Sequence, residues 1–176
     1  AFRASIGMFG VVVSMTLQAV ASYNLLKRSW NADIEDCLGG LHQRLADNRT
    51  FWFFWLPKRE SQDLFVLPSG IPNKATRDFD ICHMRTYNAV PVDEPAPASA
   101  DGPGAQFDHS SVIFPNLYEP NFREIEYAVP FADFEATFDE VRHLFLTKHT
   151  DFNFPVECRP VKADDSYLSA YAERDG

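Results

Sequence analysis

Alternation of apolar and polar side chains marks two stretches near the N-terminus as β-strands. Residues 11–19 (VVVSMTLQA) alternate with period two and are rich in β-branched side chains, and residues 23–30 are expected to form a second strand. Residues 51–56 (FWFFWL) are apolar at every position, which predicts a strand buried on both faces that stops at Pro57. We expect residues 63–67 to form a short strand that pairs with it as a hairpin.

Apolar residues recur at helical spacing in two other stretches. The first follows Asn31, a candidate N-cap, and Gly39 and Gly40 weaken it while permitting close approach of a neighbouring element. Its apolar stripe consists of Ile34, Cys37, Leu38, Leu41 and Leu45. The second follows Pro130, which suits the first position of a helix. Its stripe consists of Phe131, Phe134, Phe138, Val141 and Phe145.

The remaining chain divides into further strands and a region without a clear pattern. Residues 122–129 (FREIEYAV) alternate before the second helix, and residues 154–161 (FPVECRPV) follow it, so both are expected to be strands. Asp164 and Asp165 are candidate caps for a final turn or short helix over residues 166–171. Between residues 68 and 120 the pattern fails, and prolines and glycines predict an exposed, flexible insertion at about residues 91–106.

This order of elements predicts an α+β fold. Strand, strand, helix, strand, strand, then strand, helix, strand is typical of a mainly antiparallel sheet with helices on one face. The sequence shows no internal repeat and no sign of a second core. The 176 residues are enough for one domain with a substantial core.

Composition excludes several classes of function. The formal net charge of -9, with no basic face visible in the pattern, argues against a nucleic-acid partner. The three cysteines form no CxxC pair, so we expect reduced thiols and a reducing compartment, either the cytoplasm or an organelle lumen. The five histidines lack metal-ligand spacing, so no metal site is expected. Residues 6–20 are too polar for a transmembrane segment.

Charged residues two apart on the expected strands are the candidate chemistry. Glu157 and Arg159 would point to the same face, as a structural ion pair or water-facing edge, or as a pair that binds polyol hydroxyls and stabilises a developing anion. The residues alone favour the structural interpretation. Glu124 and Glu126 have the same spacing and are better explained as a solvated face or as salt-bridge partners than as a hydrolytic carboxylate pair. The segment SIGMFGVVV is a weak nucleotide motif and a plausible tight turn.

Four segments together resemble one family of flavoproteins. SIGMFGVVVSMTL resembles the end of the flavin-binding domain in the vanillyl-alcohol-oxidase superfamily, which reads roughly SLGxLGVVTxVTL. FWFFWLP, FREIEYAVP and FPVECRPVKADDSYLS resemble the aldonolactone oxidase branch, with its FxFFWFP, RxxEYAxP and FPVExRxxxADDxxLS. The order and spacing match over nearly the whole chain, although residues 68–120 match little.

The resemblance implies the incomplete, ferredoxin-like cap domain of FAD-linked oxidases. Residues 1–22 would end the FAD-binding domain, and residues 23–176 would form the substrate domain. It further implies that Glu157 binds sugar hydroxyls, that Arg159 positions the substrate and stabilises the reduced flavin, and that the backbone of this chain lies near FAD at the glycine segment. The residues expected there are Gly7, Gly10, Val11 and Val12. The implied reaction is oxidation of a sugar-1,4-lactone at C2, with hydride passing to flavin N5.

Departures from the family pattern leave the substrate open. Val13 stands where the family usually has Thr, and Lys58 and Arg59 follow the aromatic strand where His-Thr or Tyr-Thr is usual. The family's flavin domain lies N-terminal to the glycine segment, so the chain alone is expected to be inactive without a missing FAD-binding domain or chain. The alternatives are an alditol oxidase, which acts on open-chain polyols, and a non-catalytic module that retains the cap fold.

Overall fold

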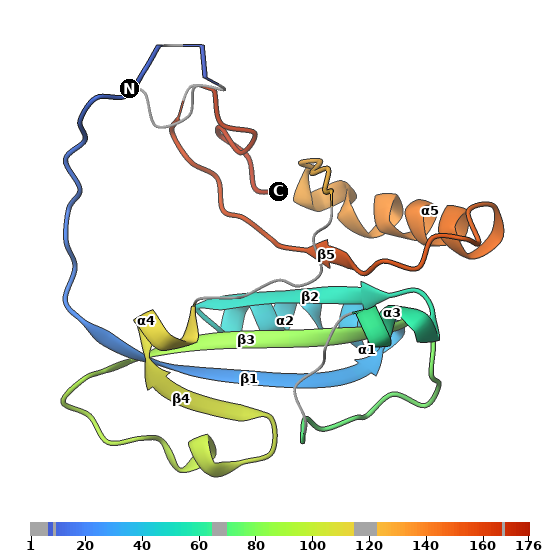
Figure 1. The fold of residues 1–176 in the computed structure, drawn as a ribbon, viewed down its shortest axis with the longest axis horizontal. Coiled ribbons are helices and arrows are strands. Elements are labelled where there is room, and N and C mark those ends of the chain that lie inside the picture. Colours follow the sequence, from blue (N-terminus) through green and yellow to red (C-terminus); the bar gives the residue numbers. More distant parts are fainter. Residues whose placement is uncertain (1–6, 9, 65–69, 115–122, 167) are drawn as a thin grey trace.

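A five-stranded antiparallel sheet forms the centre of the computed structural model (Figure 1). The structure describes residues 7–8, 10–64, 70–114, 123–166 and 168–176. The strands are β1 (Tyr23–Asp33), β2 (Thr50–Leu56), β3 (Ile81–Pro91), β4 (Ala105–His109) and β5 (Val156–Cys158). Their order is β4-β1-β3-β2-β5, and every neighbouring pair is antiparallel. The predicted α+β class is therefore confirmed.

Five α-helices lie between these strands in the described part of the chain. They are α1 (Ile34–Gly39), α2 (Leu41–Asp47), α3 (Arg59–Leu64), α4 (Ser110–Ile113) and α5 (Phe134–Thr147). Two 3-10 turns, Ala98–Asp101 and Phe131–Asp133, complete the set within the described ranges. The predicted first helix is divided between α1 and α2 at Gly40, where the Arg44 guanidinium lies against the backbone and donates to the Asp36 and Cys37 carbonyl oxygens. Its N-cap is Asp33, the last residue of β1, and not Asn31, which lies two residues earlier in that strand.

The main core lies between one face of the sheet and helices α1, α2 and α5. Phe53 and Trp55 of β2 are fully buried there, and the rings of Phe134, Phe138 and Phe145 pack on them from α5 with centroids 5.4 to 6.3 Å apart. The alternating residues of β2 face the other way and form a second cluster, which α4 covers through Ile113. The predicted phenylalanine stripe and the strand buried on both faces are thus confirmed. The larger helices cover one face, as expected, and the short helix α4 contributes apolar cover to the other.

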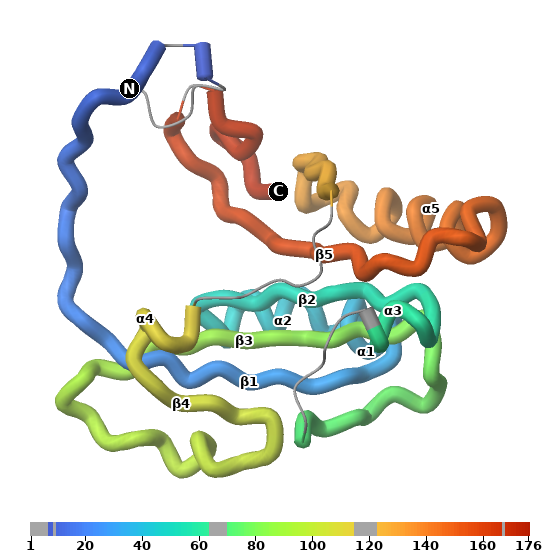
Figure 2. Tube along the Cα trace, viewed as in Figure 1, coloured from blue at the N-terminus to red at the C-terminus, as the bar shows by residue number. Residues whose placement is uncertain are grey.

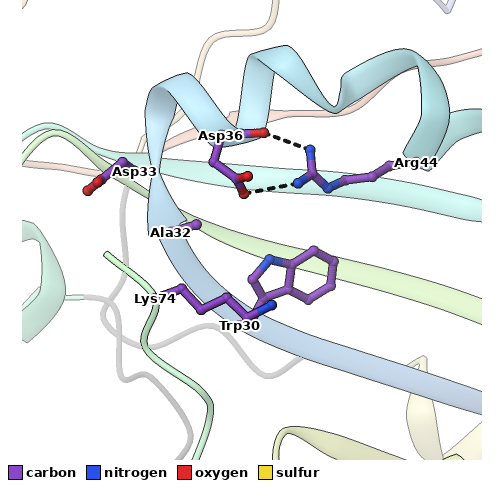
Figure 3. Close-up of a pocket in the computed structure, with 6 residues that line it drawn as sticks. All are labelled: Trp30, Ala32, Asp33, Asp36, Arg44 and Lys74. Atoms are coloured by element: carbon purple, nitrogen blue, oxygen red, sulfur yellow. Dashed lines mark hydrogen bonds and ion pairs between the residues drawn. The ribbon is translucent and has the colours of Figure 1, made fainter. Parts of the chain in front are cut away.

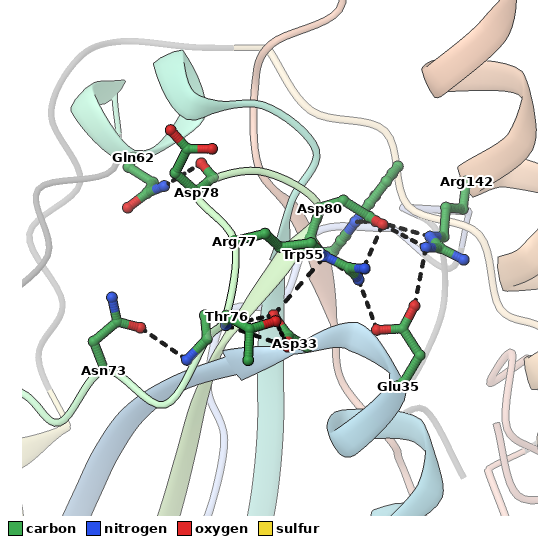
Figure 4. A network of polar contacts seen from close by, with 11 residues as sticks. Asp33, Glu35, Trp55, Gln62, Asn73, Thr76, Arg77, Asp78, Asp80 and Arg142 are labelled. Atoms are coloured by element: carbon green, nitrogen blue, oxygen red, sulfur yellow. Dashed lines mark hydrogen bonds and ion pairs between the residues drawn. The ribbon is translucent and has the colours of Figure 1, made fainter.

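A buried carboxylate joins α5 to the sheet (Figure 4). Asp80 precedes β3 with a φ of 55°, and its side chain is 4% exposed. It accepts a hydrogen bond from Trp55 Nε1 at 3.0 Å and two from the Arg142 guanidinium of α5. Arg77 Nη2 lies 3.2 Å from the same carboxylate, and Glu35 bridges Arg77 and Arg142. We call these four residues, Glu35, Arg77, Asp80 and Arg142, the Asp80 cluster.

Two of the predicted strands are wrong, although both have period-two alternation. Residues 10–22 and 123–130 have no regular secondary structure, and Val11, Leu17, Ile125 and Tyr127 are 77% to 90% exposed. Alternation describes which side chains share a face, whereas a strand also needs a hydrogen-bonded neighbour, and the described residues supply none for either segment. Residue 122, the first of the second predicted strand, lies outside the described residues.

The region around residues 59–106 also departs from expectation. Residues 63–64 end helix α3 where a strand was predicted, and residues 65–67 lie outside the described residues. Strand β3, which the sequence pattern missed, is the central strand of the sheet. The expected insertion at 91–106 instead connects β3 to edge strand β4, and the Gly104 carbonyl accepts a hydrogen bond from Ser29 N at 2.9 Å. Backbone pairing with β1 therefore anchors its end.

Candidate functional site

Glu157 lies on the face of the sheet opposite the main helices. In the β2–β5 register, Phe54 is opposite Glu157, and Phe53 is opposite Cys158. Because Phe53 and Cys158 belong to the helix-covered core, Glu157 shares the other face with Phe54. Strand β5 is short, so the motif is held in place by only three residues that pair with β2. The predicted strand over residues 154–161 is confirmed only for its middle part.

Arg159 follows β5 directly and lies beside Glu157. The Arg159 Nε atom is 3.6 Å from Glu157 Oε1, and the two side chains are 54% and 28% exposed. The two groups are therefore close together and open to solvent. An exposed guanidinium with planar donors next to a half-buried carboxylate can bind neighbouring oxygens of a polyol ring.

A second carboxylate and a tyrosine complete this group. Arg159 Nη2 donates to Glu126 Oε2 at 2.8 Å, and Tyr171 Oη donates to Glu126 Oε1 at 3.2 Å. Glu126 is thus a salt-bridge partner, as one of the sequence interpretations had it, while Glu124 is exposed and makes no hydrogen bond or ion pair within the described part of the chain. We call the four residues Glu126, Glu157, Arg159 and Tyr171 the Arg159 cluster. Sequence reasoning missed Tyr171, which no pattern links to the distant Glu126.

Burial and the nearby positive charges shift the pKa of Glu157 in opposite directions. Desolvation raises the pKa of this carboxyl above its ordinary value, and the positive charges of Arg159 and Arg85 oppose that rise. The negative charges of Glu124 and Glu126 add to the rise in its pKa. The pKa of Tyr171 is also raised, by burial and by the Glu126 carboxylate. Glu157 is therefore a carboxyl group whose charge depends on its neighbours.

A buried polar chain lies on the same face of the sheet. Asn31, His83 and Arg85 are 4%, 0% and 6% exposed. Asn31 Oδ1 lies 2.9 Å from His83 Nδ1, and Arg85 Nε donates to His83 Nε2 at 3.0 Å, so the hydrogen bonds place the histidine proton on Nδ1. The Arg85 guanidinium lies over the Trp52 and Phe54 rings, 5.0 and 5.3 Å from their centroids. Burial, followed by the charges of Arg85 and Lys27, lowers the pKa of His83 to about 3.

The glycine segment is exposed and is not brought to the Arg159 cluster by any contact between described residues. Gly7 and Gly10 have φ angles of 74° and 98°, and a Cβ at either would meet no atom within 4 Å. Val11 and Val12 are 90% and 70% exposed. Figure 2 shows this part of the chain as an extended segment, apart from the sheet, that leads into β1. Its backbone is accessible to a ligand or to another domain.

A cavity of about 440 Å³ lies at a different place, beside α1 and β1 (Figure 3). Its lining consists of Trp30, Ala32, Asp33, Asp36, Arg44 and Lys74. Arg44 and Asp36 form an ion pair at 3.0 Å, so these two charges are satisfied within the protein. None of the residues selected from the sequence lines it, and it is not the candidate site.

Neither a metal-binding cluster nor a membrane-spanning helix is present among the described residues. No group of three or more histidine, cysteine or acidic side chains there could hold a metal ion. No helix in the described ranges is long and apolar enough to cross a membrane. Cys37, Cys82 and Cys158 are free thiols.

Comparison with known proteins shows similarity to one enzyme family. The family model described as D-arabinono-1,4-lactone oxidase matches residues 98–176, which include the whole Arg159 cluster. The chain is therefore similar to members of the aldonolactone oxidase family. It is 23% identical to the L-gulonolactone oxidase of Scyliorhinus torazame over 195 residues, covering 99% of this chain and 44% of that protein. An L-gulono-1,4-lactone dehydrogenase of Mycobacterium tuberculosis is 24% identical over 192 residues, covering 99% of this chain and 45% of that protein.

A shorter match has a higher sequence identity. The L-gulonolactone oxidase of Mus musculus is 33% identical over 61 residues, which are 35% of this chain and 14% of that protein. The chain spans less than half the length of the family relatives that it matches from end to end. No solved structure matches the chain significantly.

Proposed function

We propose that this chain is the substrate-side part of an FAD-dependent sugar-1,4-lactone oxidoreductase. The observation that carries the proposal is the Arg159 cluster, an exposed guanidinium that lies 3.6 Å from a half-buried carboxylate within the family match. The relatives named as lactone oxidases and dehydrogenases supply the substrate class. Residues 1–22 would complete the FAD-binding domain, and residues 23–176 would form the cap domain.

The residues of this chain divide the work of binding. Glu157 would accept hydrogen bonds from ring hydroxyls, and its charge is the more easily lost because desolvation raises its pKa. Arg159 would donate to the lactone oxygens and hold C2 in a fixed orientation. Its permanent positive charge would also favour the negative charge that develops during oxidation. Both side chains come from one short piece of chain, so a shift of β5 would move them together.

The glycine segment fits a role at the cofactor. Gly7 and Gly10 have positive φ angles and open backbone surroundings, so a planar or phosphorylated group can approach their amides closely. These two glycines, with Val11 and Val12, would contact FAD, together with a domain or chain outside residues 1–176. When bound, FAD would supply the two-electron acceptor for oxidation at C2.

The test is a steady-state assay on the full-length protein with its flavin absorbance recorded. L-gulono-1,4-lactone and D-arabinono-1,4-lactone are compared with an alditol such as xylitol. Arg159→Met is expected to lower kcat/KM for the lactones by a factor on the order of 100 to 1,000, because a preorganised positive donor is lost. Arg123→Met removes another exposed arginine and should change kcat/KM by less than about twofold.

The other outcomes distinguish the alternatives. A flavoprotein that oxidises the alditol in preference to both lactones would replace the lactone assignment with an alditol oxidase. A full-length protein without flavin absorbance would instead support a non-catalytic module with the cap fold. Equal losses in Arg159→Met and Arg123→Met would remove Arg159 from the site.

A further inference from the structure

We propose that Glu126 is a positioning residue, which fixes the Arg159 guanidinium for lactone binding. The inference deepens the proposed function and rests on it. Glu126 lies 33 residues from Arg159 and 45 from Tyr171 along the chain, yet one carboxylate contacts both. Its Oε2 accepts from Arg159 Nη2 at 2.8 Å, while its Oε1 accepts from Tyr171 Oη at 3.2 Å.

The tyrosine end of this arrangement is anchored by its own turn. Asp164 Oδ1 accepts a hydrogen bond from Ser166 N, and Asp164 Oδ2 accepts one from Ser169 Oγ, both at 2.6 Å. The backbone N–H of Asp164 then donates to the Tyr171 carbonyl oxygen at 3.0 Å. The predicted capping by Asp164 is therefore confirmed, and it holds the backbone of Tyr171 in place. Tyr171 in turn contacts one oxygen of Glu126, so it helps to orient the carboxylate that contacts Arg159.

The segment that carries Glu126 is held at its far end. Phe131 N donates to the Asp175 carbonyl oxygen at 3.1 Å, which ties the start of the 3-10 turn before α5 to the C-terminal segment. Figure 2 shows the C-terminal end of the chain beside the start of the α5 region. Residues 123–130 have no strand partner among the described residues, so this backbone hydrogen bond and the side-chain contacts of Glu126 determine where Glu126 lies.

Stability alone does not account for the contact. The Glu126 and Arg159 side chains are 64% and 54% exposed, and an ion pair with this much solvent contributes only about 0 to 1 kcal/mol. Its geometric effect is larger than its energetic one. Glu126 holds the Nη2 corner of the guanidinium and Glu157 lies at the Nε edge, so the plane of the fork is set by two carboxylates. Within the described chain Nη1 has no protein partner, which leaves it to donate to a lactone oxygen.

Glu126→Gln and Glu124→Gln form a matched pair of variants. Both remove one exposed negative charge from the same segment, and both charges act on Glu157. The pKa of Glu157 also responds to Arg159 and Arg85, which neither variant changes. Both variants are therefore expected to lower the pKa of Glu157, and only Glu126→Gln removes an ion pair with Arg159. Any difference between the two reports the contact.

The kinetic expectation for the full-length protein is a split between KM and kcat. Glu126→Gln should raise KM for the lactone about tenfold and change kcat less than about threefold, because binding geometry is lost while the Arg159 charge remains. Glu124→Gln should leave KM within about twofold of wild type. Glu126→Asp keeps the charge but has a shorter side chain, so its KM should lie between those of Glu126→Gln and the wild type. Melting temperatures of all three should stay within about 2 °C of wild type.

A second measurement on the same protein does not depend on turnover. The Arg159 Nε–H resonance, assigned by its loss in Arg159→Lys, should shift and exchange faster with water in Glu126→Gln and stay in place in Glu124→Gln. An unchanged resonance in Glu126→Gln overturns the contact, and equal KM values in the two glutamine variants overturn the positioning role. A wild-type protein that binds flavin but oxidises no lactone would defeat the proposed function itself, and the role of Glu126 in lactone binding with it.

Discussion

Two clusters of acidic and arginine side chains in this chain differ chiefly in their exposure. In the Asp80 cluster the carboxylate is 4% exposed and bonded to Trp55 and Arg142, and it joins the loop before β3 to α5. In the Arg159 cluster the central guanidinium is 54% exposed, and its partners are Glu157 of the short strand β5 and Glu126 of a segment without regular structure. The same residue types therefore serve the fold where water is excluded and remain available to a ligand where it is not.

The largest expected effect is the loss of the Asp80 charge. Asp80→Asn keeps an acceptor for Trp55 Nε1 and tolerates the φ of 55°, so it isolates the ionic contribution. Arg77 and Arg142 would lose their buried partner, and the free energy of unfolding should fall by about 3 kcal/mol. Urea unfolding at pH 7 measures this. Asp78→Asn is the control, because Asp78 is 65% exposed and its ion pair with Arg59, at 3.7 Å, is open to solvent. Its effect on the free energy of unfolding should stay within about 0.5 kcal/mol.

An equal loss in both variants would contradict the comparison. It would mean that solvent exposure does not separate the ion pairs of this chain. Lactone binding should not follow stability: Asp80→Asn should leave KM for the lactone near the wild-type value below its melting temperature, because Asp80 has no contact with the Arg159 cluster among the described residues.

The second expected effect comes from His83, which shares a face of the sheet with Glu157 but is fully buried. Its pKa is about 3 in the folded state and about 6.5 in the unfolded state. Above pH 6.5 neither state binds the proton. As the pH falls, the unfolded state takes up a proton that the folded state refuses, so stability is lost between pH 6.5 and about 3. At pH 5 the loss should be about 2 kcal/mol.

Urea unfolding at pH 7 and pH 5 tests this, with His83→Gln as the comparison. The glutamine variant will be less stable at both pH values, because the buried hydrogen bonds change. Its loss between pH 7 and pH 5 should nevertheless be smaller than that of the wild type by about 2 kcal/mol. Identical pH dependence in the two proteins would show that His83 is not held neutral by burial.

The sequence predicted the parts of the fold whose apolar pattern is continuous. The apolar run of β2 is buried on both faces, and the phenylalanine stripe of α5 packs on one of these faces in the main core, as expected. Strand β3 was missed because His83 and Arg85 occupy buried positions, where the alternation of a strand predicts apolar side chains. Their burial depends on hydrogen bonds with Asn31 and on the aromatic rings of β2, which no local pattern contains.

The candidate site was predictable in part. The spacing of Glu157 and Arg159 placed the two side chains together, because the chain between them is nearly extended. Glu126 carried a strand-like alternation that led to the wrong backbone, yet its expected role as an ion-pair partner is seen. Tyr171 could not be found, because its contact spans 45 residues and depends on the turn that Asp164 closes.

The smallest expected effect, and the one of opposite sign, belongs to Glu157. Desolvation is the largest influence on its pKa and raises it, so this carboxylate opposes folding when it is ionised. Its contribution to stability is fully present below the unfolded pKa and is lost as the pH rises through the folded pKa. Glu157→Gln should therefore raise the free energy of unfolding at pH 7 slightly, by no more than about 0.5 kcal/mol, because part of the side chain remains in water.

Urea unfolding at pH 7 and at pH 4 decides the sign for Glu157→Gln. The variant should match or exceed the wild type at pH 7, and any advantage should shrink toward pH 4, where the carboxyl group is increasingly neutral in both states. Lactone oxidation by the same variant should fall at the same time, since Glu157 is proposed to bind the sugar hydroxyls. A residue that costs stability and supports activity is held for function. If Glu157→Gln instead destabilises the protein as much as Asp80→Asn does, the Arg159 cluster serves the fold, and the contrast between the two clusters is lost.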